Sequence, residues 1–184
     1  MRLPRFAPGQ PVPVIGLSGL PVDVRGAWSL WRIAIQTDEW SQRRIMSLFV
    51  HDDGRMLAPT ARRIWDEMLT VDVTIRGYVE GEEADRIYHR SLDTAVTNGK
   101  HVYGELLDAH RNRLRREQEK GGYAFSVRRS AVERIGLPEV RSHRLSQLSR
   151  EQGAWRERLA QKMQASPDMA PLILVRLEGG NTLG

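Results

Sequence analysis

The chain of 184 residues contains no cysteine and no long apolar run. Without cysteine it has no disulfide, no thiolate metal site and no cysteine nucleophile, which fits a reducing compartment. No stretch approaches the roughly 20 consecutive apolar residues of a membrane-spanning helix. Prolines interrupt the basic N-terminal residues, so they lack the apolar core of a signal peptide. These absences predict a cytoplasmic protein that does not enter the membrane.

Patterns typical of catalysis are also missing. The five histidines include no His-x-x-x-His pair, and no Gly-x-Ser-x-Gly motif or complete phosphate-binding loop is present. His51-Asp52-Asp53 resembles a site, because an imidazole and two carboxylates can bind a metal. Asp beside Gly54 is equally typical of a tight turn, which we favour. The sequence therefore predicts no enzyme, no cofactor and no metal site, with a small metal-dependent hydrolase as the least favoured alternative.

What the chain does have is a concentrated basic segment. Residues 111–144 contain ten Lys or Arg and four acidic residues, a net charge of +6, whereas the whole chain has a net charge of +5. Arginine is the preferred partner of phosphate groups, and such a surface favours an anionic partner. We therefore predict contact with DNA or another nucleic acid. The predicted phosphate-binding residues are Arg113, Arg116, Lys120, Arg128, Arg129, Arg141 and Arg144.

Aromatic residues offer a second way to contact nucleic acid. Tyr123 and Phe125 lie between the basic clusters, where they either stack on bases or pack the end of a helical hairpin. The five tryptophans have spacings typical of core positions, with two exceptions. Trp155 is expected on a helix–helix seam, and Trp40, in a predicted loop, is the tryptophan expected to be exposed.

The N-terminal half of the chain predicts a small sheet. Residues 1–25 contain five of the nine prolines and are predicted as an extended lead-in or linker, although residues 12–15 are apolar enough to pack at a sheet edge. Aromatic and β-branched residues predict two antiparallel strands, at 28–37 and 43–50. A short amphipathic helix is predicted over 60–69, begun by a Thr cap or by proline. Residues 71–79 fit either a strand or an irregular linker.

Long helices dominate the rest. Apolar residues spaced three and four apart predict a helix from Glu82 to Lys120, ended by Gly121-Gly122, and a short helix over 125–135. Another helix is predicted from Pro138 to about Ala165, and a terminal strand over 171–178. Two helices of this length, each with an apolar stripe along one side, are expected to pair as an antiparallel coiled-coil hairpin over about 82–165. The basic segment would lie at the tip of this hairpin.

The predicted fold class is therefore α+β. It combines a small antiparallel sheet, a short covering helix and a long projecting antiparallel helical hairpin. After the lead-in at 1–25, residues 26–184 are expected to form a single domain.

Two stretches carry a resemblance to a known family. "LFVHDDGRMLAPTARRIWDEML" at 48–69 and residues 128–179 resemble the extreme C-terminal region of large bacterial SNF2-type helicases. These are the HepA-like superfamily II ATPases, some encoded in phage-defence loci such as DISARM. The resemblance implies a module that belongs to an ATP-driven DNA translocase, in cis or in trans. The chain lacks the family's phosphate loop, Asp-Glu-x-His box and arginine finger, so no catalytic residue can be assigned from it.

Taken with the charge, this resemblance predicts a non-catalytic, helicase-associated accessory domain. Its basic hairpin tip would contact nucleic acid through phosphate groups rather than base edges. A different class remains open: a coiled-coil scaffold that binds proteins and uses its charge only for solubility.

Overall fold

The computed structural model describes residues 7–17, 19–37, 41–71 and 73–179. Trp40 lies outside the described residues. The chain divides into two compact units. The sheet unit comprises Met1–Ala34, Arg43–Tyr103 and Asp168–Gly184, and the helical unit comprises Ile35–Gln42 and Gly104–Pro167. Within the described ranges, none of the helices combines the length and the apolar character needed to cross a membrane. The fold class is α+β, as predicted.

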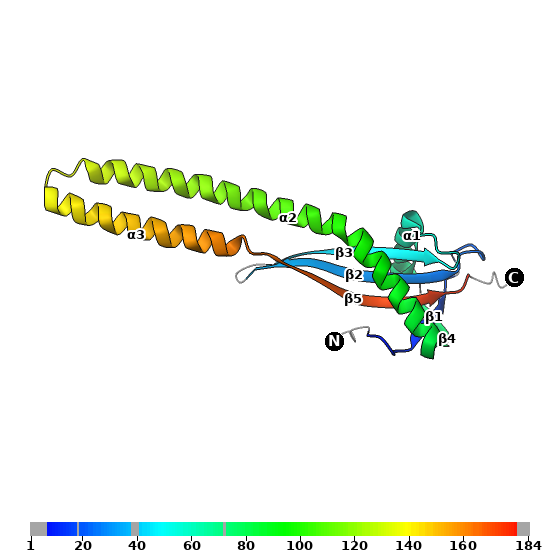
Figure 1. Cartoon of the computed structure of the whole chain (residues 1–184). Coiled ribbons are helices and arrows are strands. Elements are labelled where there is room, and N and C mark those ends of the chain that lie inside the picture. The colour runs from blue at the N-terminus through cyan, green and yellow to red at the C-terminus, as the bar shows by residue number, and fades with distance from the viewer. Residues whose placement is uncertain (1–6, 18, 38–40, 72, 180–184) are drawn as a thin grey trace. The chain divides into compact units, whose positions relative to one another are not determined.

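In the part of the chain that the structure describes, five strands form one mixed sheet in the order β3-β2-β5-β1-β4 (Figure 1). β1 pairs antiparallel with β4 and parallel with β5. The strands are β1 (Val12–Gly16), β2 (Gly26–Gln36), β3 (Ser41–His51), β4 (Thr74–Val79) and β5 (Ser166–Leu177).

The prediction of a purely antiparallel sheet is wrong. The parallel pair joins Val14 to Arg176 and Ile15 to Leu177, so its two strands come from opposite ends of the chain. No turn residue or local spacing signals a pairing of that separation, because parallel strands need a long crossover. β1, which lies within the predicted lead-in at 1–25, is therefore an inner strand of the sheet, between β5 and β4. Residues 71–79 were predicted as a strand or a linker, and residues 74–79 form the strand β4.

The sheet is covered on both faces. The strand β2 shows this most clearly, since neighbouring side chains along a strand point to opposite faces. Trp28, 0% exposed, packs with α1 (Ala58–Thr70) and donates a hydrogen bond of 3.0 Å from Nε1 to the Ala61 carbonyl. Trp31, 1% exposed, belongs to a second cluster with Ala95 of α2 (Gly81–Glu133). The predicted core positions of both tryptophans are confirmed.

The helix α1 was predicted at 60–69 and spans Ala58–Thr70. Its first turn contains Pro59, and Leu57 at the N-cap position makes no side-chain capping bond. Of the two predicted ways of starting this helix, proline in the first turn is the one found. Ala61 and Ile64, both 0% exposed, turn its apolar face to the sheet.

The predicted end of the long helix at Gly121-Gly122 is wrong. α2 continues through both glycines to Glu133, so the predicted short helix over 125–135 is its last part. Glycine costs about 1 kcal/mol in a helix interior, an amount that packing can offset. At Gly121 a Cβ atom would overlap the six-membered ring of Trp155, so glycine serves close packing here rather than chain termination.

The first turns of α2 also pack differently from the prediction. Ala84, Leu92 and Ala95 lie against the strands, although the predicted hairpin seam began at residue 82. α2 comes close to the strand β2 at Gly99, where an added Cβ would lie 3.2 Å from Ile33 Cδ1. Helical periodicity shows that a helix has an apolar face but not which element covers it.

The C-terminal elements keep their predicted order with shifted bounds. α3 spans Pro138–Lys162, with the predicted proline in its first turn. β5 begins at Ser166, earlier than the predicted 171. The prediction missed residues 166–170 because they contain few of the apolar residues that signal a strand.

Candidate nucleic-acid interface

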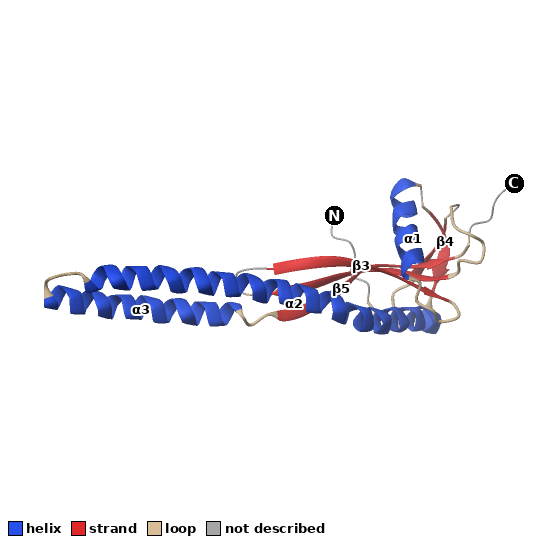
Figure 2. Cartoon of the chain, turned by 90° about the horizontal axis from the view of Figure 1, so that it is seen from above, coloured by secondary structure: helices blue, strands red, loops and turns tan. Residues whose placement is uncertain are grey.

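The part of α2 that belongs to the helical unit is residues 104–133. α3 runs alongside this part in the opposite direction (Figure 2). The contacts between the two helices occur in reversed order along the chain. From the start of this part of α2, the contacting pairs are His110–Lys162, Glu117–Lys162, Phe125–Trp155 and Arg128–Glu151.

The seam between these helices contains buried leucines and one histidine. Leu106, Leu114 and Leu148 are at most 3% exposed, and Leu159 is 7% exposed. His110 is 1% exposed, and its Nε2 lies 2.8 Å from the carbonyl oxygen of Lys162. The seam fixes which sides of α2 and α3 remain available to solvent.

Trp155 crosses the seam at the glycine pair. Its ring lies over Gly121, and its centroid is 5.4 Å from that of Phe125. Gly122, the next residue, would place an added Cβ in open space, with no atom within 4 Å. The two adjacent glycines therefore have different surroundings, and only Gly121 makes room for the indole.

A groove of about 630 Å³ opens beside this indole, and we call it the Trp155 groove. Three of the seven predicted phosphate-binding residues lie in it. The acidic residue in its lining, Glu117, is bonded to Lys162 at 3.2 Å. The groove thus combines three basic side chains, one paired carboxylate and part of an aromatic ring. Its lining residues are Arg113, Arg116, Glu117, Lys120, Gly121 and Trp155.

The predicted phosphate-binding residues outside the Trp155 groove differ from one another in their bonding partners. Arg128 donates a 2.7 Å hydrogen bond to Glu151, and this bond holds the pKa of the Glu151 carboxyl below its usual range. The Arg128 guanidinium also lies 5.6 Å from the centroid of the Phe125 ring. Arg141 donates to the Ile135 carbonyl at 3.3 Å. Arg128 therefore joins α2 to α3, whereas Arg141 joins the first turn of α3 to the loop before it.

Arg129 and Arg144 are both exposed. Arg144 lines a smaller hollow of about 270 Å³, together with Arg128 and Glu151. The structure therefore brings the seven predicted residues together in part. Arg113, Arg116 and Lys120 share the Trp155 groove, Arg128 and Arg144 share the hollow nearer the loop, and Arg129 and Arg141 line neither.

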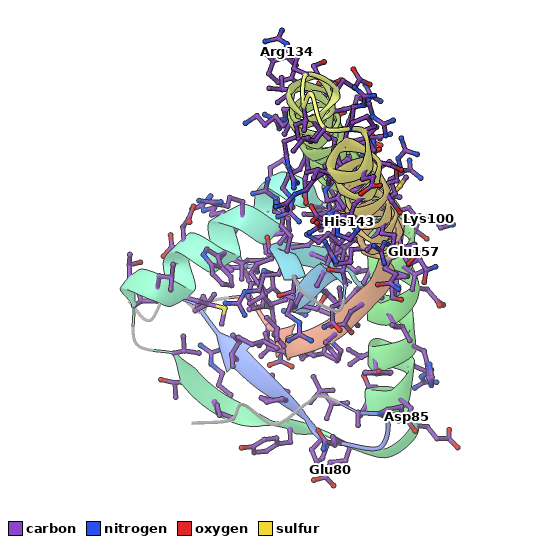
Figure 3. All side chains as sticks on the ribbon, turned by 90° about the vertical axis from the view of Figure 1, so that its left-hand side faces the viewer. Glu80, Asp85, Lys100, Arg134, His143 and Glu157 are labelled. Carbon is purple, nitrogen blue, oxygen red and sulfur yellow. The ribbon has the colours of Figure 1, made fainter. Side chains whose placement is uncertain are left out.

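The helical unit as a whole has a surplus of basic side chains. Between residues 104 and 167 there are fourteen Lys or Arg and eight Asp or Glu. Arg111, Arg128 and Lys162 pair with carboxylates, and Arg113 has an interaction partner. The rest have no carboxylate within 4.0 Å among the described residues: Arg115, Arg116, Lys120, Arg129, Arg134, Arg141, Arg144, Arg150, Arg156 and Arg158. Arg134 points away from the helices (Figure 3).

The sequence interpretation missed two features of this surface. Trp155 was assigned to seam packing, and its exposed part in the groove depends on the missing side chain at Gly121. Arg156, with Trp155, lines a further groove of about 410 Å³, yet it falls outside the 111–144 segment. A count of charge along α3 would have found Arg156; no local pattern predicts the exposure of Trp155.

His51-Asp52-Asp53, the alternative site, forms a turn in the sheet unit. Arg55 lies 2.6 Å from the Asp53 carboxylate, and this bond lowers the pKa of Asp53 strongly. The Asp23 carbonyl, and then Asp53, raise the pKa of His51. Both carboxylate oxygens of Asp52 accept from Arg176. Arginines therefore occupy the oxygens that a metal would need.

Gly54 completes the turn with a φ of 96°. In the described part of the chain, no group of three or more His, Cys, Asp or Glu side chains is placed to hold a metal ion. The local geometry thus supports the interpretation of these residues as a tight turn.

Comparison with known proteins gives no relative to set beside this geometry. No family model, no curated protein and no solved structure matches the chain.

Proposed function

We propose that the helical unit binds nucleic acid through its basic surface, with the Trp155 groove as the main contact. The observation that carries this proposal is the grouping of Arg113, Arg116 and Lys120 around an indole, where the acidic neighbour is already paired. Arginine forks match phosphate oxygens, and each neutralised phosphate releases counterions, which favours binding. The exposed arginines along both helices would extend this contact beyond the groove.

The shape of the unit suits such a role. We propose that α2 and α3 pair as an antiparallel coiled-coil hairpin, since leucines fill their seam and their contacts run in reversed order. A hairpin of this kind holds its surface arginines on rigid helices. The backbone of these helices is ordered before binding, so only the side chains of the arginines lose conformational entropy on contact with phosphates.

For the cellular context, we propose a non-catalytic accessory domain of a SNF2-like helicase or translocase, present in cis or in trans. This part of the proposal depends on the resemblance of residues 48–69 and 128–179 to the C-terminal region of those helicases. In this role, the helical unit would hold DNA while a separate ATPase motor moves along it. The arginine partners of Asp52 and Asp53 argue against a metal-dependent hydrolase at the 51–55 turn.

The test is a binding titration with two charge-matched variants. One variant changes Arg116, Lys120 and Arg129 of the helical unit to Glu. The other changes Arg43, Arg44 and Arg86 of the sheet unit to Glu, so both lose the same net charge. All six side chains are exposed, and within the described residues none has a carboxylate within 4.0 Å.

We expect the first variant to lose most of its affinity for a labelled DNA at low salt, and the second to lose much less. Equal losses would mean that total charge, rather than this surface, determines binding. Absence of binding by the unaltered protein at low salt would contradict the proposal and favour the protein-binding scaffold.

One observation favours the scaffold as a second candidate function. β4 is an edge strand, and its Ile75 and Tyr78 side chains are 52% and 59% exposed. An open edge with exposed apolar side chains can accept an extended segment of a partner protein through backbone hydrogen bonds. This surface belongs to the sheet unit, so it is compatible with nucleic-acid binding by the helical unit. Loss of partner binding when a proline replaces Ile75 would test it.

A further inference from the structure

The basic surface of α2 contains an exposed aromatic ring. Tyr123 is 73% exposed, the highest value among the exposed large hydrophobic side chains of the described residues. It follows Lys120 by three residues and Arg116 by seven. Residues three, four and seven apart lie along one side of a helix, so Tyr123 continues the line of the two basic side chains. An apolar ring left in water beside two cations is a surface suited to a partner that has both apolar faces and negative charge.

A second ring lies on the neighbouring surface. Trp155 lines the Trp155 groove together with Arg116 and Lys120, and it is only partly buried. A groove of about 630 Å³ is within the range that accommodates small organic ligands, so a nucleotide fits its size. Lys120 belongs both to this groove and to the line that leads to Tyr123, so the two rings flank the same basic side chains.

We propose that this surface binds single-stranded nucleic acid, with bases stacked on Tyr123 and Trp155 and the phosphates held by Arg113, Arg116 and Lys120. This inference depends on the proposed function and names its substrate class. Alternation of aromatic rings and cations is how proteins hold single strands without reading their sequence. In a duplex the base faces are already stacked on one another, so these rings would remain unused.

The probes are three labelled DNAs of equal length: a single strand of twenty thymidines, a strand of the same backbone without bases, and a duplex. Each is titrated against the unaltered protein and two tyrosine variants by fluorescence anisotropy. Tyr123→Ala removes the ring from the helical unit. Tyr78→Ala is the matched control, because Tyr78 is a similarly exposed tyrosine in the sheet unit, 59% exposed. Circular dichroism checks that both variants keep their helices.

Each stacked base contributes about 5- to 150-fold in affinity, so with two rings we expect the unaltered protein to bind the thymidine strand at least about 25-fold more tightly than the baseless strand. It should also bind this strand more tightly than the duplex at the same salt concentration. Tyr123→Ala should reduce the ratio between the thymidine and baseless strands by about 5-fold or more, and Tyr78→Ala should leave it unchanged.

The other outcomes separate this inference from the proposed function. Equal, salt-sensitive binding of the thymidine and baseless strands would overturn stacking while leaving nucleic-acid binding in place. An unchanged ratio in Tyr123→Ala, or tighter binding of the duplex, would also overturn the inference. Absence of binding to all three probes would overturn both proposals.

Discussion

Replacing Gly121 by alanine should destabilise the helical unit relative to the same replacement at Gly122. Both substitutions gain about 1 kcal/mol of helix propensity, because both glycines lie inside α2. At Gly122 the added Cβ meets no atom within 4 Å, so the stability should rise by about 0.5–1 kcal/mol. At Gly121 the Cβ would overlap the Trp155 ring, and overpacking costs about 1–3 kcal/mol. The two variants should therefore differ by about 1–3 kcal/mol.

The assay is thermal unfolding followed by circular dichroism at the helical signal. For a chain of this length, about 1 kcal/mol shifts Tm by roughly 2–4 °C, so we expect the Gly121→Ala midpoint to lie about 2–12 °C below that of Gly122→Ala. A second cycle adds Trp155→Leu to each variant, which removes the ring and should bring the two midpoints together. Equal stabilisation by both alanines in the unaltered background would refute the packing of α3 on α2 at this register.

Three further predictions concern other parts of the chain. Ile64→Ala should cost about 2–5 kcal/mol in chemical denaturation, because Ile64 is 0% exposed, whereas Leu69→Ala on the same helix should cost little because Leu69 is 71% exposed. His51→Gln should lower stability most in acid, because the raised pKa of His51 stabilises the fold while the imidazole is protonated. That difference should shrink as the pH rises above the ordinary value of 6.5, and a difference that grows instead would contradict it. Arg128→Ala should return the pKa of Glu151 toward its usual value in an NMR titration, and an unchanged value would show that their hydrogen bond is absent in solution.

Local patterns in the sequence predicted several elements correctly. The aromatic and β-branched residues around Trp28 and Trp31 identify a strand, and Pro59 marks the start of α1. These signals act between near neighbours in the chain. The pairing of Val14 with Arg176 has no such signal, because it joins residues at opposite ends of the sequence.

The error at Gly121-Gly122 has a different origin. A glycine pair ends a helix when its backbone turns, and it continues the helix when a bulky side chain needs the space. The two cases look alike in the sequence, since the deciding residue, Trp155, is more than thirty positions away.

The candidate site was predictable as a charge surplus but not as a surface. The count of basic residues assigned Arg128 and Arg141 to phosphate binding, like the other arginines of the segment. In the structure, Arg128 bonds Glu151 and Arg141 bonds the Ile135 carbonyl. The grouping of Arg116 and Lys120 with Trp155 depends on the pairing of two helices, which sets the sides that face each other.

The most direct test of nucleic-acid binding by the helical unit is the salt dependence of affinity for single-stranded DNA. Each phosphate contact contributes about 0.7 to the slope of log K against log salt concentration on a single strand. The variant with Glu at Arg116, Lys120 and Arg129 should therefore lose about 2 units of slope or more. The control with Glu at Arg43, Arg44 and Arg86 should keep the slope of the unaltered protein. Equal slopes in the two variants, or no measurable binding at low salt, would contradict the account.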